Sequence, residues 1–325
     1  MLAEFAHLFL SRQDSSTTNS GNHTTTEFTF PANLTLSHYP SNDTTSTAVP
    51  TSTTTQLSLG AAFLQEDDAN EVAETQESQG THERVLEGYG KVVGIALREG
   101  YLYVPSYQTG KINILSTPDM ITLEEYQCPG CTIYDITVLS TGAIVVAQGR
   151  QQVLSKLDSR GLLESQIHLS YQTKGITSTA EDQIIVLSRS HEKVYLYDSD
   201  LNLVETVPIP GKEEGDCNFL AANGNSVFVS CQEAVYGFTL QGDLLFKILP
   251  PPGISYAVGI DVDEQERMLV VRRGMGVVDI YDKEGNYMES VGDNQNSLWS
   301  DIAVGEGYLY AIDYIEAKVK VFRLG

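Results

Sequence analysis

Residues 258–271 begin with Val258-Gly259-Ile260-Asp261, continue through an acidic turn and end in Leu269-Val270-Val271, and this unit decides the fold because it recurs. An apolar residue that follows a Gly, Asp or Asn occurs at Ile95, Ile136, Ile176, Phe219, Ile260 and Ile302, with spacings of 41, 40, 43, 41 and 42 residues. A period near 40 residues with strand-like contents is typical of a β-propeller, in which each repeat forms one blade. The spacing therefore predicts an all-β fold, a six-bladed β-propeller.

Each repeat contains the pieces of a four-stranded blade. A second apolar run follows the first in every repeat, at 102–104, 144–146, 184–186, 227–229, 269–271 and 309–312. An alternating strand comes next, as in Val194-Tyr195-Leu196-Tyr197, and then a turn such as Gln241-Gly242-Asp243 or Lys283-Glu284-Gly285-Asn286. Gly, Asp and Asn are the residues that favour hairpin turns. We therefore expect consecutive antiparallel strands within each blade.

The two ends of the repeat region complement each other. The sixth repeat stops at Leu324-Gly325, after its third strand, and the segment His82-Glu83-Arg84-Val85-Leu86 lies just before the first repeat. We expect this segment to supply the missing fourth strand. The ring would then be closed, with no open sheet edge between the first and last blades.

Over residues 82–325 the repeats resemble the NHL-repeat family of six-bladed propellers, as in the C-terminal region of tripartite-motif proteins. The likeness is carried by Val93-Gly94-Ile95-Ala96, Val258-Gly259-Ile260-Asp261 and Ser300-Asp301-Ile302-Ala303. The resemblance implies a module that recruits other molecules. WD40 and YWTD propellers are disfavoured, since they would carry a Trp in most blades and this chain has 1, Trp299.

Charge narrows the kind of partner. Of 43 acidic and 20 basic residues, 10 and 1 lie in residues 1–80, which leaves 33 and 19 in the propeller region. Because an acidic surface repels a phosphate backbone, we expect no nucleic-acid partner.

The N-terminal region differs in composition from the repeats. Residues 1–80 contain 25 Ser and Thr, too little apolar surface to offset the entropy of ordering. We therefore divide the chain into a disordered Ser/Thr-rich tail or stalk, residues 1–80, and a propeller, residues 81–325, which we expect to be monomeric. The apolar patch at residues 5–10 is a poor signal peptide and too short to span a membrane. We expect no direct membrane insertion.

Two features bear on the compartment. The tail has N-glycosylation sequons at Asn22, Asn33 and Asn42, which suit an extracellular stalk, although a tail so rich in Ser and Thr also yields such motifs by chance. Localisation in the secretory pathway or outside the cell is therefore our hypothesis, with the cytoplasm as the alternative, and the chain is either cytosolic or lacks a targeting segment.

The cysteines favour an oxidising compartment. Cys217 and Cys231 are symmetric about Gly224, so a hairpin centred there would place them opposite each other, at a distance that accepts a disulfide. Cys128 and Cys131 lie in a turn between two blades and would form a second, local bridge. Four cysteines in two plausible pairs suit an oxidising compartment, although free buried thiols would look the same in the sequence.

No catalytic constellation is evident, and we expect no cofactor. The histidines of the repeats, His82, His168 and His191, fall on two outer strands and a loop, where they cannot easily share one metal ion. Acidic residues recur near the first strands at Asp135, Asp216, Asp261 and Asp301. They could ring the channel and hold a cation, but Asp at the start of a strand more often satisfies backbone groups.

A binding face is the feature that remains. The loops on one side of the ring carry Tyr, Trp, Arg and His side chains, of which the first three types anchor many interfaces. The predicted partner-binding residues are Tyr107, Tyr134, Arg189, His191, Tyr256, Arg272, Arg273, Trp299 and Tyr314. The alternative for each of the aromatic residues is packing between blades.

Three functions stay open. The leading hypothesis is a non-catalytic propeller that binds a protein or peptide ligand, as an extracellular recognition domain. The resemblance to tripartite-motif proteins implies a second, the substrate-recognition propeller of a ubiquitin ligase. The third is a propeller hydrolase or lyase with a central cation.

Overall fold

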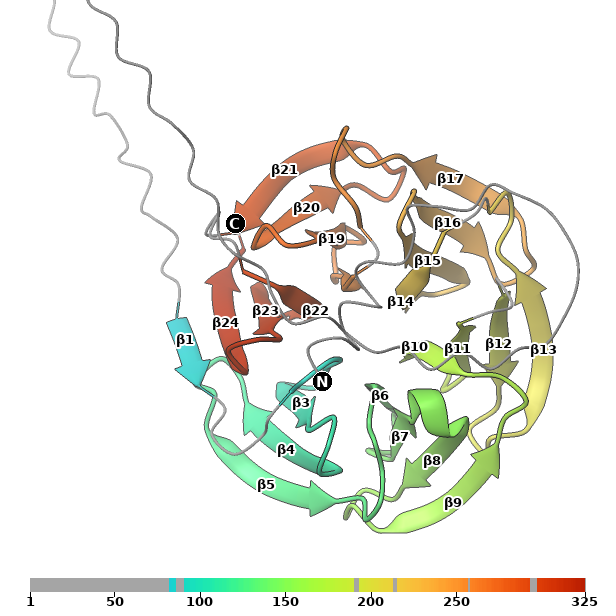
Figure 1. Ribbon diagram of the computed structural model, residues 1–325, viewed down its shortest axis with the longest axis vertical. Coiled ribbons are helices and arrows are strands. Elements are labelled where there is room, and N and C mark those ends of the chain that lie inside the picture. The colour runs from blue at the N-terminus through green and yellow to red at the C-terminus, as the bar shows by residue number, and fades with distance from the viewer. Residues whose placement is uncertain are drawn as a thin grey trace, which may run out of the picture. The chain divides into compact units, whose positions relative to one another are not determined.

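The structure is a computed structural model that describes residues 82–85, 91–189, 193–212, 215–256, 258–292 and 297–324 (Figure 1). The predicted tail, its three sequons and His191 lie outside these residues. None of the described residues belongs to a helix long and apolar enough to cross a lipid bilayer.

Six four-stranded antiparallel sheets surround a central channel, so the predicted six-bladed propeller is confirmed (Figure 1). Blades one to three consist of β2 (Ala96–Arg98), β3 (Tyr101–Pro105), β4 (Lys111–Ser116) and β5 (Thr122–Gln127); β6 (Asp135–Val138), β7 (Ile144–Ala147), β8 (Val153–Leu157) and β9 (Leu163–His168); and β10 (Thr173–Ser178), β11 (Ile184–Ser188), β12 (Lys193–Tyr197) and β13 (Leu203–Pro208). A 3₁₀ helix, η1 (Gly149–Gln151), connects β7 to β8.

The remaining blades repeat this order. They consist of β14 (Cys217–Asn223), β15 (Ser226–Cys231), β16 (Val235–Thr239) and β17 (Leu244–Ile248); β18 (Ile260–Val262), β19 (Met268–Arg272), β20 (Val277–Tyr281) and β21 (Tyr287–Gly292); and β22 (Trp299–Gly305), β23 (Tyr308–Asp313), β24 (Lys318–Arg323) and β1 (His82–Val85). The first strand of each blade is innermost and the fourth is outermost (Figure 1).

The ring is closed by the segment that the sequence predicts. β1 pairs with β24 in antiparallel register, with His82 opposite Val321 and Val85 opposite Lys318. The sixth blade is therefore built from both ends of the described chain, and the last three strands gain the partner that their sheet lacks.

The core lies between neighbouring blades. Ile302 and Trp299 of blade six pack in one cluster with Val258 and Leu269 of blade five. Strands in the middle of a blade contact a neighbour on both faces, and β7 is accordingly buried along its whole length. The outer strand β9 alternates between exposed and partly buried residues, because one of its sides faces water.

The small residue of the repeat signature is explained by close packing around the channel. A Cβ added to Gly259 would lie 2.5 Å from Cα of Asp301, and one added to Gly94 would lie 2.9 Å from Cα of Asp135. Any side chain there would collide with the backbone of the next blade. Glycine therefore occupies this position in blades one, three and five, as Gly94, Gly175 and Gly259. Asp or Asn occupies it in the other three blades.

Candidate functional site

One end of the channel is surrounded by residues that hold equivalent places in five blades. In each of these blades, the backbone N–H of a residue just after the second strand forms a hydrogen bond of 2.8–3.0 Å. The acceptor is the carbonyl of a residue that precedes the first strand of the same blade. The donors are Tyr107, Arg189, Gln232, Arg273 and Tyr314, and the acceptors are on Lys91, Gln172, Asp216, Ser255 and Leu298. This shared geometry places the five donors around one opening, which we call the channel mouth.

Five of the predicted partner-binding residues come together there: Tyr107, Tyr134, Arg189, Arg273 and Tyr314. The charge of Arg189 acts on the Tyr134 hydroxyl, and Tyr107 is close enough to act on both other tyrosines. Burial raises the pKa of Tyr134 and of Tyr314 well above the ordinary value. Tyr134 and Tyr314 therefore stay neutral; Tyr134 is partly exposed, whereas Tyr314 is 6% exposed and its ring lies beside the ammonium group of Lys91.

Three of the predicted residues do not line the mouth. Tyr256 and Trp299 are 0% and 1% exposed, and both side chains contact residues of their own blades. The Tyr256 hydroxyl donates to Asp279 Oδ2 at 2.7 Å, and the Trp299 ring packs 5.3 Å from that of Phe322. Arg272 forms an ion pair with Asp279, Nη2 to Oδ1 at 2.7 Å. We therefore withdraw these three from the predicted interface, because their side chains stabilise the blades instead.

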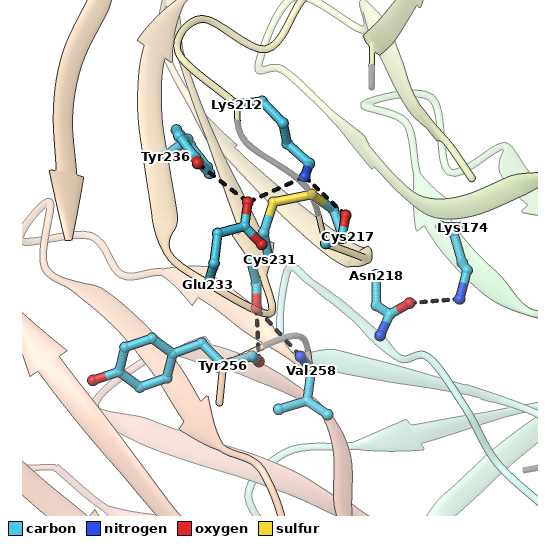
Figure 2. The surroundings of a disulfide bond; sticks show 11 residues. Lys174, Lys212, Cys217, Asn218, Cys231, Glu233, Tyr236, Tyr256 and Val258 are labelled. Atoms are coloured by element: carbon cyan, nitrogen blue, oxygen red, sulfur yellow. Dashed lines mark hydrogen bonds and ion pairs between the residues drawn. A yellow bond between two sulfur atoms is a disulfide. The ribbon is translucent and has the colours of Figure 1, made fainter. Parts of the chain in front are cut away.

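Lys174 at the start of β10 is a residue that the sequence reading missed. It is only 2% exposed, and its Nζ donates to Asn218 Oδ1 of the next blade at 2.5 Å (Figure 2). The same Nζ lies 5.6 Å from the centre of the Tyr134 ring, which stacks on Phe219. Lysine is rarely this buried, but a single Lys in a strand gives no sequence signal of burial.

The electrostatic surroundings of Lys174 are mixed but mostly positive. Burial, together with the charges of Arg189 and Arg273, lowers its pKa to about 7, and the carboxylate of Asp216 opposes this shift. Burial also lowers the pKa of Arg273. Lys91 adds another cation at the mouth, with its Nζ 4.8 Å from the centre of the Tyr314 ring. Among the described residues, the mouth thus combines four cationic side chains with three tyrosines, in a chain whose net charge is −23.

Irregular strand pairing positions Lys174 and Asn218. The register of β10 against β11 shifts between Thr173 and Ile176, and that of β14 against β15 shifts between Cys217 and Phe219. Lys174 and Asn218 lie inside these two shifts. Bulges of this kind redirect side chains and are common beside functional sites.

The predicted disulfides are both present. Cys217 and Cys231 are direct cross-strand partners, with Cα atoms 3.9 Å apart, and their bond lies next to Asn218 (Figure 2). Cys128 and Cys131 are also bonded, within the turn that leads to blade two. The first bond therefore ties together the two strands that carry one side of the mouth.

Three of the channel carboxylates accept hydrogen bonds from backbone N–H groups. Asp135 Oδ2 accepts the N–H of Ile176 at 2.8 Å, and Asp301 Oδ2 accepts the N–H of Ile95 at 2.9 Å. Asp261 does the same for Val304 at 2.8 Å. Each aspartate thereby links its blade to the next, as the alternative interpretation of these residues expected, whereas the side chain of the fourth, Asp216, belongs to the mouth.

Burial and mutual repulsion disfavour the charged form of these carboxylates. Burial raises the pKa of Asp135 to about 8 and that of Asp261 to about 7, and Asp301 is raised by burial and by Asp135. The three line a cavity of about 190 Å³ formed by the first strands. No group of three or more His, Cys, Asp or Glu suited to a metal ion occurs among the residues that the structure describes.

Comparisons with known proteins support the fold. No protein-family model matches the chain, and no curated protein sequence matches it, so the resemblance to NHL repeats remains a prediction. Among solved structures, the chain is similar to an inactive variant of virginiamycin B lyase from Staphylococcus aureus bound to quinupristin. The TM-score is 0.57 and the identity 16%, over 72% of this chain and 82% of the lyase.

Two further structures have the same TM-score of 0.57. A streptogramin B lyase is 14% identical over 76% of this chain and 98% of its own. The β-propeller domain of Cps50 (Swd1) from Myceliophteria thermophila is 10% identical over 75% of this chain and 100% of its own. At such low identities these likenesses show the propeller fold alone.

Proposed function

We propose that this chain is a non-catalytic recognition module whose propeller binds a protein or peptide at the channel mouth. One observation carries the proposal: Tyr107, Tyr134 and Tyr314 converge with Arg189 and Arg273 around one opening, although they come from five different blades. Tyr and Arg are the residue types that contribute most to binding at protein interfaces.

The surface properties of these residues support a binding role. Arg189 is exposed, and Tyr107, Tyr134 and Arg273 are partly exposed, so each offers surface to a partner. Their backbones are held by the strand ends of a closed ring, which keeps the entropy cost of binding low. The propeller thus presents a preformed surface.

We further propose that recognition takes place in an oxidising compartment, the secretory pathway or the cell exterior. The two disulfides support this, since such bonds persist where thiols are not kept reduced. Mass measurement of the protein from its native cells, with and without reduction, tests it: four free thiols before reduction would contradict the assignment.

Cross-linking from the mouth tests the binding role. A photoreactive phenylalanine replaces Tyr107 in the full chain within its native cells, and the matched control carries it at Tyr287, a 56% exposed residue of the outer strand β21. We expect a discrete cross-linked protein from position 107 alone, and weaker binding of that protein to Arg189→Ala. Equal cross-linking from both positions, or unchanged binding to Arg189→Ala, would contradict the proposal.

A further inference from the structure

Lys174 breaks a threefold repeat within the ring. The residue two places before the repeated apolar position is Val93 in blade one, Lys174 in blade three and Val258 in blade five. Both valines are buried, at 2% and 4% exposure. The fold therefore accepts a small apolar side chain at this position. Burying an ammonium group there instead costs desolvation free energy, so packing alone does not explain the lysine.

The group that holds Lys174 departs from the repeat as well. Asn218 in blade four is equivalent to Asp135 in blade two and Asp301 in blade six. In those blades the carboxylate accepts an N–H from the next blade, whereas Asn218 Oδ1 accepts the Lys174 ammonium. An aspartate at 218 would neutralise Lys174. The amide orients the ammonium without cancelling its charge.

Two arginines add to this charge, one from the same blade as Lys174 and one from blade five. Arg189 follows β11 in blade three and Arg273 follows β19 in blade five, and both act on Lys174. Asp216 is the described carboxylate that opposes them, and the Tyr134 ring covers one side of the ammonium. A bound anion would relieve the repulsion among the three cations. Guanidinium groups match the planar shape of a carboxylate in particular.

We infer that Lys174, Arg189 and Arg273 form a seat for a carboxylate of the bound polypeptide. This inference rests on the proposed function and specifies the chemistry of the group that enters the mouth. The carboxylate is either an Asp or Glu side chain or a chain terminus, and both have the same charge and shape.

A carboxylate bound in this seat should also change the protonation of Lys174. Because burial and the neighbouring arginines lower the pKa of Lys174 to about 7, the amine loses its proton as the pH rises through neutrality. A carboxylate beside the amine favours the charged form and raises that pKa. Binding at a pH above about 7 therefore takes up a proton, and the affinity falls as the pH rises further, by up to about tenfold per pH unit.

The experiment is an NMR titration of the full chain with four small probes. Glutamate with acetylated amine and amidated carboxyl presents only a side-chain carboxylate, and acetyl-alanine presents only a main-chain one. The glutamine analogue of the first probe is its neutral control, and inorganic phosphate tests the alternative anion. We expect saturable shifts at the mouth for one or both carboxylates. Equal binding of the glutamine analogue, or binding of phosphate alone, would overturn the inference.

Two substitutions taken from the other blades test the seat without disturbing the fold. Asn218→Asp introduces the carboxylate found in blades two and six, which would form an ion pair with Lys174 in place of the ligand. Lys174→Val introduces the valine found in blades one and five. We expect each to weaken carboxylate binding about tenfold or more, the loss of one charge-assisted contact. Lys283→Ala, in the exposed turn between β20 and β21, is the matched control and should bind as the wild type does.

The pH dependence separates a functional lysine from a structural one. In the wild type the affinity falls between about pH 7 and pH 9, and in Lys174→Val the residual binding does not follow pH in this range. Binding that is unchanged in Asn218→Asp and independent of pH would overturn the carboxylate seat. If the cross-linked partner still depends on Arg189 in that case, the proposed function stands and only its carboxylate chemistry is wrong.

Discussion

Arg272 and Arg273 are adjacent in sequence but have different surroundings, and truncating each one separates stability from binding. Arg272 Nη2 lies 2.7 Å from Oδ1 of Asp279, and its Nε lies 2.9 Å from Oδ2. The Asp279 side chain is 1% exposed and that of Arg272 is 24% exposed. Arg272→Ala therefore leaves a buried carboxylate without its counter-charge, whereas Arg273→Ala removes one of several cations at the mouth.

The expected loss for Arg272→Ala follows from these contacts. Removing one partner of a fully buried ion pair costs about 3–5 kcal/mol. Arg272 is partly exposed, and Asp279 keeps hydrogen bonds from the hydroxyls of Tyr256 at 2.7 Å and Ser290 at 2.6 Å. We therefore expect the free energy of unfolding to fall by about 2–3 kcal/mol. For a domain of this size the melting temperature then falls by roughly 4–12 °C.

Urea denaturation, followed by fluorescence, measures this change. Trp299 is the 1 Trp in the chain and is 1% exposed, so its emission reports on the loss of the core. Arg273→Ala is the matched control, with an expected change of less than about 0.5 kcal/mol but weaker carboxylate binding. If Arg272→Ala changes stability by less than about 0.5 kcal/mol, the reasoning about the buried pair is refuted.

Three other substitutions test parts of the fold. Replacing Cys217 and Cys231 by Ser opens a bond of sequence separation 14 and should lower the free energy of unfolding by about 3 kcal/mol in urea titrations; a double variant as stable as the oxidised wild type would contradict this. In the folded protein Asp135 has its pKa raised from 3.8 to about 8, so the folded state holds more protons than the unfolded state and stability falls as the pH rises through that window. Asp135→Asn should flatten this fall in melting curves between about pH 5 and pH 7, and an unchanged slope would exclude Asp135 as its source. Gly259→Ala places a Cβ 2.5 Å from the backbone of Asp301 and should lower the free energy of unfolding by about 1–3 kcal/mol in the same urea assay. An unchanged free energy would mean that the two blades move apart to accept the methyl group.

The repeat architecture is predictable because its determinants are local. Each blade is a series of hairpins between consecutive strands, so the period and turn residues suffice to count six blades. The closure of the ring by β1 and β24 also follows from counting strands, since an unpaired sheet edge is unfavourable. Cys217 and Cys231 could be paired because they lie at the two ends of one hairpin, although the turn alone does not align them: a register shift between Cys217 and Phe219 brings Cys217 opposite Cys231.

The site residues are less predictable because residues at the same end of the ring can direct their side chains either to the mouth or into a blade. Tyr314 follows the second strand of blade six and Trp299 begins the first, so both fall at the same end of the ring, yet only Tyr314 lines the mouth. Trp299 packs against Phe322 within the blade. Arg272 and Arg273 are adjacent in the sequence. Because side chains alternate in direction along a strand, the side chain of Arg272 points into the blade.

The amino-acid sequence by itself determined that this chain forms a closed ring of six β-blades, because strands, turns and their period depend on neighbours along the chain. Only the tertiary structure decided what lies at the channel mouth. Lys174 and Asn218 are 44 residues apart and belong to different blades. Their contact, and the arginine charges around it, exist because blades three, four and five pack side by side, and no local pattern records which side chains that packing brings together.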